Sequence, residues 1–288
     1  MRSSNSSSDW TAALIEDNRL TLWTLKASQV VELRSFSRRA PDPELDLVDA
    51  LTQLGAAQTN PVLADGLGPR PSVQIPSKPA DLTPKSYDLE GWQIHALPGL
   101  GQQNPLALMQ GRSAQIAGFL ALNPKWDGVI CLPGAVTHWV QVSAAEVVSF
   151  QSTLTTGLHD ALASSLSLEQ AWSESALVEA AADTMSHPER LASRLAEISA
   201  AVHFTGASPE ATGRLWGCLL GAELAAARPY WLGQNLAMIA TDQLAAPYLA
   251  SFAAQGLPVT QAQPERMALE GLVQSWRQMN GATPDSKG

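Results

Sequence analysis

One stretch combines residue types that could bind a phosphate. In VICLPGAVTHWVQV, residues 129–142, two apolar runs flank a break at Pro133-Gly134, and Thr137 and His138 follow the break directly. A glycine turn of this kind allows a close backbone approach, and a hydroxyl beside it can donate to an anion. The same pattern is also typical of an ordinary β-hairpin. Both interpretations stay open at this stage.

Glu223 is the second residue whose type and place point to chemistry. It lies inside LWGCLLGAELAAA, an otherwise apolar run of residues 215–227, and a buried carboxyl is costly unless it is paired. The histidines and the two cysteines show no spacing that indicates a metal site or a catalytic triad. We interpret Cys131 and Cys218 as reduced thiols in the core.

Charge and composition exclude some classes of function. The 288 residues carry 18 basic and 27 acidic side chains, for a net charge of −9, and 45% are hydrophobic. This balance argues against nucleic acid or an anionic membrane as the main partner. The serine-rich start lacks the apolar core of a signal peptide, so we expect a cytoplasmic protein with flexible tails at residues 1–9 and 281–288.

The elements that must position these residues are mixed α and β. Alternating apolar residues predict a strand meander over residues 10–34, a helix over 44–55 that ends at Gly55, and a strand at 61–65. A Pro/Gly-rich loop, a strand at 92–100 and a helical stretch near 105–121 follow.

The second half begins with hairpin strands and continues with helices. Ser186 to Glu189 are typical of a capping box, and Leu191, Leu195, Ile198 and Val202 share one helical face. Residues 212–228 predict a buried helix. A strand at 235–240, a helix at 243–255 and a strand at 257–262 then form a β-α-β unit, which implies parallel pairing.

Two long segments resemble a known family. The run from Met109 to Phe150 and the run from Arg214 to Ala240 are similar to 2-dehydro-3-deoxygalactonokinases, and the resemblance extends from Trp10 to about Trp276. It implies an α/β fold of two ribonuclease-H-like (actin-like ATPase) domains with a cleft between them, which we place at residues 10–118 and 119–280. It also implies ATP and Mg²⁺ as cofactors and a sugar acid as the small-molecule partner, and a homodimer is the one assembly considered.

The first phosphate loop of the family departs most from its usual pattern here. In AALIEDNRLTLW, residues 12–23, Leu14 stands at the position of the family's carboxylate, Glu16 at that of a glycine and Thr21 at that of an arginine. Asp17, Glu16 and, in the second loop, His138 are the catalytic candidates that remain, and no metal ligand is assigned. The alternative is a solvated hairpin turn.

Substrate contacts are implied at further positions. ADGLGPR, residues 64–70, keeps an arginine at Arg70 that could clamp a carboxylate. MQGRSAQ, residues 109–115, keeps Gln115 but has Arg112 and Ser113 in place of an acidic pair. The remaining substrate-binding candidates implied by the resemblance are Thr156, Gly157 and Glu223.

The resemblance also implies nucleotide contacts. The turn at 133–139 corresponds to the second phosphate loop, where Gly134 and Thr137 are candidates for binding phosphate and His138 stands where relatives carry a lysine. Ala240 and Thr241 lie where relatives place a glycine near the adenosine. For Gly217 and Gly221 we favour close helix packing over a ligand contact.

Three functions are therefore compatible with the sequence. The first is an ATP-dependent kinase that phosphorylates 2-dehydro-3-deoxy-D-galactonate. The second is a catalytically impaired pseudokinase that binds a sugar acid or nucleotide without turnover. The third is a structural or assembly protein with a closed cleft, filled by Ile15, Val136 and Leu158.

Overall fold

The structure is a computed structural model, and it describes residues 9–68 and 72–281. The chain divides into two compact units that are not continuous in sequence. Unit 1 comprises residues 1–126, 143–149 and 263–288, and unit 2 comprises residues 127–142 and 150–262. Most of the tails expected at 1–9 and 281–288 lies outside the described residues, but Asp9 opens the first strand and Gly281 follows the last helix.

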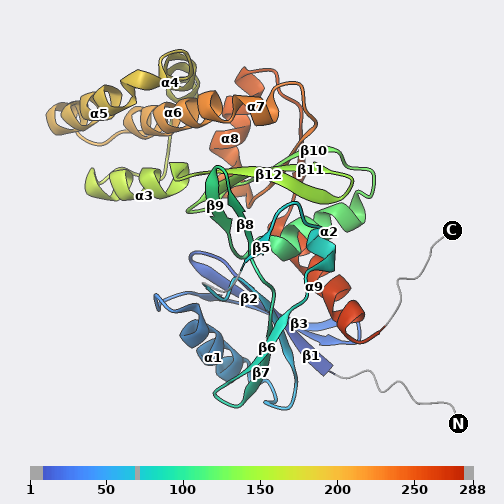
Figure 1. Ribbon diagram of the computed structural model, residues 1–288. Helices are drawn as coiled ribbons and strands as arrows, with labels where there is room; N and C mark the ends of the chain where they lie inside the picture. Colours follow the sequence, from blue (N-terminus) through green and yellow to red (C-terminus); the bar gives the residue numbers. More distant parts are fainter. Residues whose placement is uncertain (1–8, 69–71, 282–288) are drawn as a thin grey trace, which may run out of the picture. The chain divides into compact units, whose positions relative to one another are not determined.

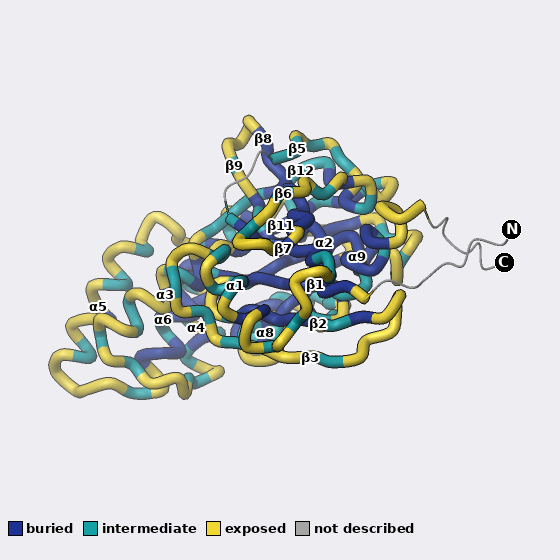
Figure 2. Tube along the Cα trace, turned by 90° about the horizontal axis from the view of Figure 1, so that it is seen from below, coloured by how far each residue is buried: buried dark blue, intermediate teal, exposed yellow. Residues whose placement is uncertain are grey.

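The main sheet of unit 1 has six strands in the order β3-β2-β1-β4-β7-β6 (Figure 1). The first three form the expected meander, whereas β4 and β7 pair in parallel with the strands before them. The strands are β1 (Asp9–Ile15), β2 (Arg19–Lys26), β3 (Gln29–Ser37), β4 (Val62–Asp65), β6 (Lys85–Leu89) and β7 (Trp92–Ala96). β1 and β4 are buried. β3 is mostly exposed (Figure 2).

A smaller sheet and four helical segments complete unit 1. The sheet has the order β5-β8-β9, and its strands are β5 (Val73–Gln74), β8 (Leu100–Gln103) and β9 (Leu106–Met109). The helical segments are α1 (Pro43–Leu54), the 3₁₀ helix η1 (Pro79–Asp81), α2 (Ser113–Leu122) and α9 (Pro264–Met279). As predicted, α1 ends at Gly55, which takes the left-handed conformation with φ 71°.

Helix α9 belongs to unit 1 because it packs closely on both β1 and α2. The rings of Trp10 and Trp276 stack with centroids 4.6 Å apart. Gly118 and Gly271 let the backbones of α2 and α9 touch, since a Cβ at either position would overlap a carbonyl of the other helix. The boundary expected between residues 118 and 119 falls inside α2, so the sequence-based division does not coincide with these units.

Unit 2 is built on a five-stranded sheet in the order β12-β11-β10-β13-β14. β10 pairs antiparallel with β11 and parallel with β13, and β13 pairs parallel with β14, as the predicted β-α-β unit requires. The strands are β10 (Gly128–Leu132), β11 (Thr137–Ser143), β12 (Glu146–Thr153), β13 (Leu236–Ile239) and β14 (Val259–Ala262). The order of this sheet repeats that of β3-β2-β1-β4-β7, which confirms two ribonuclease-H-like units.

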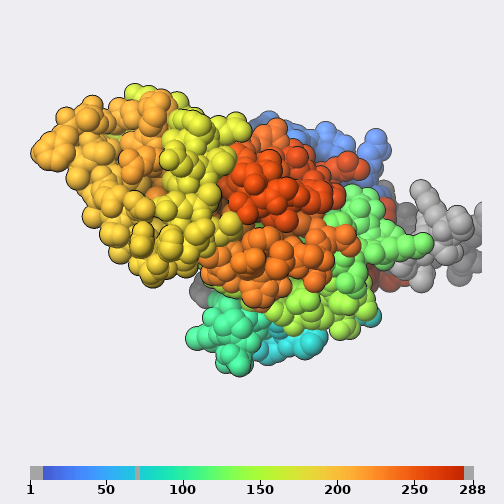
Figure 3. All heavy atoms as spheres, turned by 90° about the horizontal axis from the view of Figure 1, so that it is seen from above, coloured from blue at the N-terminus to red at the C-terminus, as the bar shows by residue number. Residues whose placement is uncertain are grey.

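Helices cover this second sheet and extend beyond it. They are α3 (Thr155–Ser165), α4 (Glu174–Ser186), the 3₁₀ helix η2 (Pro188–Arg190), α5 (Leu191–Thr205), α6 (Pro209–Ala226), α7 (Arg228–Trp231) and α8 (Asp242–Ala254). Gly217 and Gly221 lie against the carbonyls of Leu177 and Ala181, so α4 and α6 cross at close range, as predicted. α4, α5 and α6 lie side by side in Figure 3.

Two local predictions are wrong. The stretch near 105–112 is not helical, because Leu106–Met109 pairs with β8 and Gly111, with φ 68°, interrupts the chain before α2 begins at Ser113. Ser186 does not cap the next helix. It is the last residue of α4, and its hydroxyl donates to the carbonyl of Ala182 at 3.0 Å. The apolar face predicted downstream is confirmed in the cluster that α5 and α6 share.

Candidate functional site

In unit 1, a buried carboxyl lies at the carboxyl end of the central parallel strands. Leu14 in β1 is fully buried and pairs in register with Asp65, the last residue of β4. The Asp65 Oδ2 accepts a hydrogen bond of 2.7 Å from the backbone N–H of Ala114, in the first turn of α2. The strand end that lacks a carboxylate at position 14 therefore has one on the adjacent strand.

The surroundings of Asp65 shift the pKa of its carboxyl group. Burial raises its pKa from the ordinary 3.8 to about 6, against the lowering effects of the Ala114 amide, the Arg112 charge and the Gly66 amide. Its Oδ1 is buried and has no hydrogen bond of normal geometry. Asp65 is therefore largely ionised at neutral pH, although its ionised form is disfavoured by desolvation.

Close backbone contacts hold this strand end together. Gly66 has φ 101°, and a side chain there would overlap the carbonyl of Ile15 at the end of β1. A Cβ at Gly111 would lie 3.1 Å from the Cα of Gly66. Because the ends of β1, β4 and the turn before α2 touch in this way, the polar side chains that follow them are brought close together.

Three polar side chains form a network beside Asp65. The Glu16 Oε1 lies 3.4 Å from Gln115 Nε2 and 3.5 Å from Arg112 Nη1, and Arg112 Nη1 donates to Gln115 Oε1 at 3.1 Å. Glu16 Oε2 is also 3.6 Å from Arg19 Nη2, which pairs with Glu265 at 2.6 Å. The network brings together Glu16 and Gln115, which were predicted as separate contacts.

The other candidates in unit 1 lie elsewhere. Asp17 is exposed in the β1–β2 turn, where its backbone carbonyl accepts from Arg38 at 3.4 Å. Asp9 lies at the opposite end of β1 from Leu14. Thr21 is buried and its hydroxyl lies 3.2 Å from that of Ser35. Arg70 lies outside the described residues, so its predicted role as a carboxylate clamp stays a prediction.

In unit 2, the turn after β10 packs against the start of α3. A Cβ on Gly157 would lie 2.9 Å from the carbonyl oxygen of Ala135, so this glycine permits the close contact. Thr156 is 7% exposed, and its buried hydroxyl makes no hydrogen bond of normal geometry. It lies close enough to Tyr248 to lower the pKa of the Tyr248 hydroxyl, against the larger raising effect of burial. The structure thus brings the candidates Gly134, Thr156 and Gly157 to one turn and one helix start.

Glu223 lies in the core beneath this turn. Its Oε1 accepts from Trp139 Nε1 at 2.7 Å, and its Oε2 accepts from the Tyr248 hydroxyl at 3.3 Å. The hydroxyls of Tyr248 and Thr137 lie 2.8 Å apart. Burial raises the pKa of Glu223, and hydrogen bonds from threonine, tryptophan and tyrosine side chains oppose this shift. Glu223 is therefore the partner of core donors and supports Thr137 through Tyr248.

When Glu223 is ionised, the hydrogen bonds around it also set the direction of the Thr137 hydroxyl. An ionised carboxylate only accepts, so Tyr248 donates its single proton to Glu223. The Tyr248 oxygen can then only accept from Thr137. In this state the Thr137 hydroxyl points inward, and it is fully buried.

His138 is bound within its own sheet. It is 4% exposed, its Nδ1 lies 2.8 Å from the Ser152 hydroxyl on β12, and its ring meets Phe150 edge-on. This geometry favours the hairpin interpretation of His138 over that of a lysine substitute. Val136 and Leu158 remain 37% and 46% exposed on unit 2, so neither is a core residue of that unit.

Ala240 and Thr241 lie between the end of β13 at Ile239 and the start of α8 at Asp242. Ala240 is buried, and Thr241 takes the extended N-cap conformation, although its side chain makes no capping hydrogen bond. The two predicted nucleotide contacts therefore lie at the carboxyl end of a parallel strand, the edge where open α/β sheets bind ligands.

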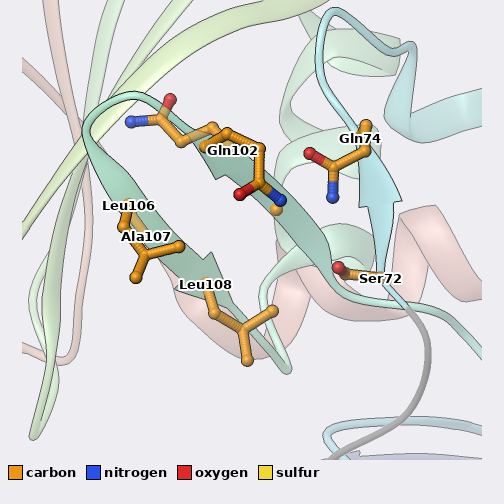
Figure 4. A pocket seen from close by; sticks show the side chains of 8 residues that line it. Ser72, Gln74, Gln102, Leu106, Ala107 and Leu108 are labelled. Carbon is orange, nitrogen blue, oxygen red and sulfur yellow. The ribbon is translucent and has the colours of Figure 1, made fainter.

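A pocket of about 380 Å³ lies on the small sheet of unit 1. Gln74 and Gln102, on neighbouring strands, line it together with Ser72 and the exposed leucines of β9 (Figure 4). Its lining carries no charged side chain among the described residues. These residues offer no cation to balance the charge of an anionic ligand, so we assign no anion to this pocket.

Among the described residues, no group of three or more His, Cys, Asp or Glu is arranged to bind a metal ion. Cys131 and Cys218 are buried free thiols, as predicted, and burial raises the pKa of both. No helix of the described chain has the length and apolarity needed to cross a bilayer.

Two ribonuclease-H-like units with polar groups at the strand ends define a protein of the actin-like ATPase fold. Solved structures agree. An activator of 2-hydroxyisocaproyl-CoA dehydratase from Clostridium difficile, solved with bound ADPNP, superposes with a TM-score of 0.53 at 12% identity over 97% of this chain and 98% of that chain. A protein from Sinorhizobium meliloti that is assigned to the 2-dehydro-3-deoxygalactonokinases superposes with a TM-score of 0.85 at 21% identity, covering 97% and 99% of the two chains.

The family follows from the sequence comparison. The model of the 2-keto-3-deoxy-galactonokinase family matches residues 51–275, and the chain belongs to this family. A 2-dehydro-3-deoxygalactonokinase of Escherichia coli strain K12 is 29% identical over 180 residues, or 59% of this chain and 60% of its own length. One named as the same enzyme in Rhizobium meliloti strain 1021 is 26% identical over 192 residues, or 62% of each. The matched regions span less than two thirds of either relative.

Proposed function

We propose that this protein transfers the terminal phosphoryl group of ATP to a hydroxyl of a 2-keto-3-deoxy sugar acid. The observation that carries the proposal is the family match over residues 51–275, which includes β4, the whole of unit 2 and most of α9. The family name gives the galacto compound as the substrate. The resemblance to the same enzymes in the segment from Met109 to Phe150 points the same way.

The geometry of unit 2 supports the phosphate-binding part of this function. The turn at 133–136 and the first turn of α3 present backbone groups in close contact, and the N-terminus of an 11-residue helix favours an anion. We therefore place the phosphates of ATP along this turn and the adenosine near Ala240 and Thr241.

The geometry of unit 1 supports the part of the function that needs an acidic group. Phosphoryl transfer depends on positioning and electrostatics, so the carboxylate missing at Leu14 matters. Asp65 restores a negative charge in register with that position and fixes the start of α2, from which Arg112 and Gln115 project. Because Asp65 is buried, we assign it a positioning and electrostatic role. Mg²⁺ would be bound through the phosphates of ATP, and we assign no protein ligand to it.

A second candidate function is a binding protein without turnover. The observation that favours it is Glu16, which places a carboxylate where the family pattern has the glycine of its first phosphate loop. A negative charge near the transferred phosphate would oppose its approach. This candidate predicts saturable binding of ATP or of a sugar acid with no phosphorylated product.

The test is a phosphoryl-transfer assay with mass-spectrometric detection of the product. Purified protein is incubated with MgATP and 2-keto-3-deoxy-galactonate, and the acid is examined for one added phosphoryl group. We expect turnover in the range of about 1–100 per second that is typical of kinases. Binding of both ligands by folded protein without the phosphorylated acid would reject the kinase and support the binding protein.

A further inference from the structure

The carboxylate of Glu16 contacts two hydrogen-bond donors at the start of α2. Arg112 occupies the N-cap position of α2, and Gln115 is the third residue of the helix. Both are nearly inaccessible, at 8% and 0% exposed, whereas the Glu16 side chain is 15% exposed. The distances of 3.5 Å and 3.4 Å to Glu16 lie at the long end of polar contacts, so Glu16 is held loosely.

The two donors are oriented independently of Glu16. Arg112 carries only donors, so the Gln115 oxygen must be the atom that faces it, at 3.1 Å. The amide nitrogen of Gln115 then points to the place where the Glu16 carboxylate lies. A guanidinium N–H and an amide N–H converging on one point, at the positive end of a helix, are a donor set for a carboxylate.

Glu16 has a second cation to which its side chain can turn. Its other oxygen is 3.6 Å from Arg19, and Arg19 is held in place by Glu265 at 2.6 Å. Glu16 lies at the start of the β1–β2 turn, and its backbone N–H donates to the carbonyl of Arg19 at 2.8 Å. Its side chain can therefore leave Arg112 while the backbone stays in place and an opposite charge remains near.

We propose that Arg112 and Gln115 form the binding site for the carboxylate of the sugar-acid substrate, and that Glu16 occupies this site as an internal carboxylate until the substrate displaces it. The identity of the ligand rests on the proposed function, whereas the donor set does not. Asp65 also faces Arg112 and contributes a fixed negative charge, so Arg112 is partly neutralised whether or not Glu16 is displaced.

The test is isothermal titration calorimetry of 2-keto-3-deoxy-galactonate without ATP, which reports binding in the absence of turnover. Removing the internal charge with Glu16→Gln is expected to tighten binding at least fivefold. Removing the guanidinium with Arg112→Gln is expected to weaken it at least tenfold. The methyl ester of the same acid lacks the charge, so its affinity should change less than twofold in both variants.

Glu179→Gln is the matched control, since it removes an exposed carboxylate on α4, outside this cluster. It should change the affinity for the acid less than twofold. Equal affinities in the wild type and Glu16→Gln would overturn the proposal, as would an absence of binding in both. Because Glu16 lies in a turn, this variant keeps the test valid if Arg112→Gln fails to fold.

The outcomes separate this proposal from the proposed function. Acid binding with the expected response to both variants, but without a phosphorylated product, would support the carboxylate site and reject the kinase. Normal turnover with unchanged acid affinity in Glu16→Gln and Arg112→Gln would support the kinase and reject the carboxylate site.

Discussion

Asp65 lies directly opposite Leu14 in the parallel pairing of β4 and β1. Leu14 stands where the family pattern has a carboxylate, and both residues are fully buried. The acidic group of this strand end is therefore present on the neighbouring strand, some fifty positions further along the chain. Its contact with Ala114 connects it to α2, and α2 carries the side chains to which we assign the substrate carboxylate.

Asp65→Asn should change the pH dependence of stability. The folded-state pKa of Asp65 is raised to about 6 from 3.8, so its favourable contribution is fully present below about pH 4 and is lost as the pH rises through 6. Two pKa units correspond to roughly 3 kcal/mol. The free energy of unfolding of the variant, relative to wild type, should therefore rise by up to about 3 kcal/mol between pH 4 and pH 7. Urea unfolding across this range measures it, and a pH-independent difference would contradict the assignment.

Glu223→Gln should destabilise unit 2. The Trp139 and Tyr248 side chains both donate to the Glu223 carboxylate, and an amide nitrogen cannot accept either hydrogen bond. Leaving one buried donor unsatisfied costs about 1–3 kcal/mol. Glu179→Gln, on the exposed face of α4, is the control and should change the free energy of unfolding by less than about 0.5 kcal/mol. Equal effects of the two variants in urea unfolding would show that the Glu223 network is not stabilising.

Gly157→Ala should weaken nucleotide binding more than it changes stability. Alanine in a helix is favoured over glycine by up to about 1 kcal/mol, but here its Cβ would lie 2.9 Å from the Ala135 carbonyl and displace the turn at 133–136. We expect the Kd for ATP, measured by calorimetry, to rise about tenfold, which is roughly 1.4 kcal/mol.

Ser164→Ala is the control for Gly157→Ala, because Ser164 is exposed near the end of the same helix. It should leave the Kd for ATP unchanged. If Gly157→Ala binds ATP as tightly as wild type, the turn at 133–136 does not hold the phosphates.

Local patterns predicted much of the fold. The meander, α1 with its Gly55 cap and the β13-α8-β14 unit all follow from hydrophobic periodicity and turn residues. The helix predicted at 105–112 was wrong because an apolar run as short as Leu106–Met109 does not show from sequence whether it forms a strand or a helix. Pairing with β8 makes it a strand. The capping box predicted at Ser186 was wrong because the preceding helix continues through this residue.

The candidate site was only partly predictable. Glu16, Gln115, Thr156 and Gly157 were identified by their positions in the resemblance, but their contacts depend on chain segments far apart in sequence. Asp65 was missed because only Arg70 was considered as a functional residue in the stretch 64–70, although the strand predicted at 61–65 ends at Asp65. An available signal was its place at the carboxyl end of the apolar strand Val62–Asp65, where functional groups of parallel sheets gather. No sequence pattern indicated Tyr248, since its hydrogen bonds to Thr137 and Glu223 depend on the packing of α8 against β11 and α6.

The measurement that tests the central claim most directly is the rate of phosphoryl transfer from ATP to 2-keto-3-deoxy-galactonate in the wild type and two variants. We expect wild type to turn over, and Asp65→Asn, which keeps an acceptor for Ala114, to lose at least tenfold in kcat. Leu14→Asp in the Asp65→Asn background restores the charge on β1 and should regain activity. Unchanged kcat in folded Asp65→Asn, or no phosphorylated acid from wild type, would contradict the claim that Asp65 replaces the missing carboxylate of a working kinase.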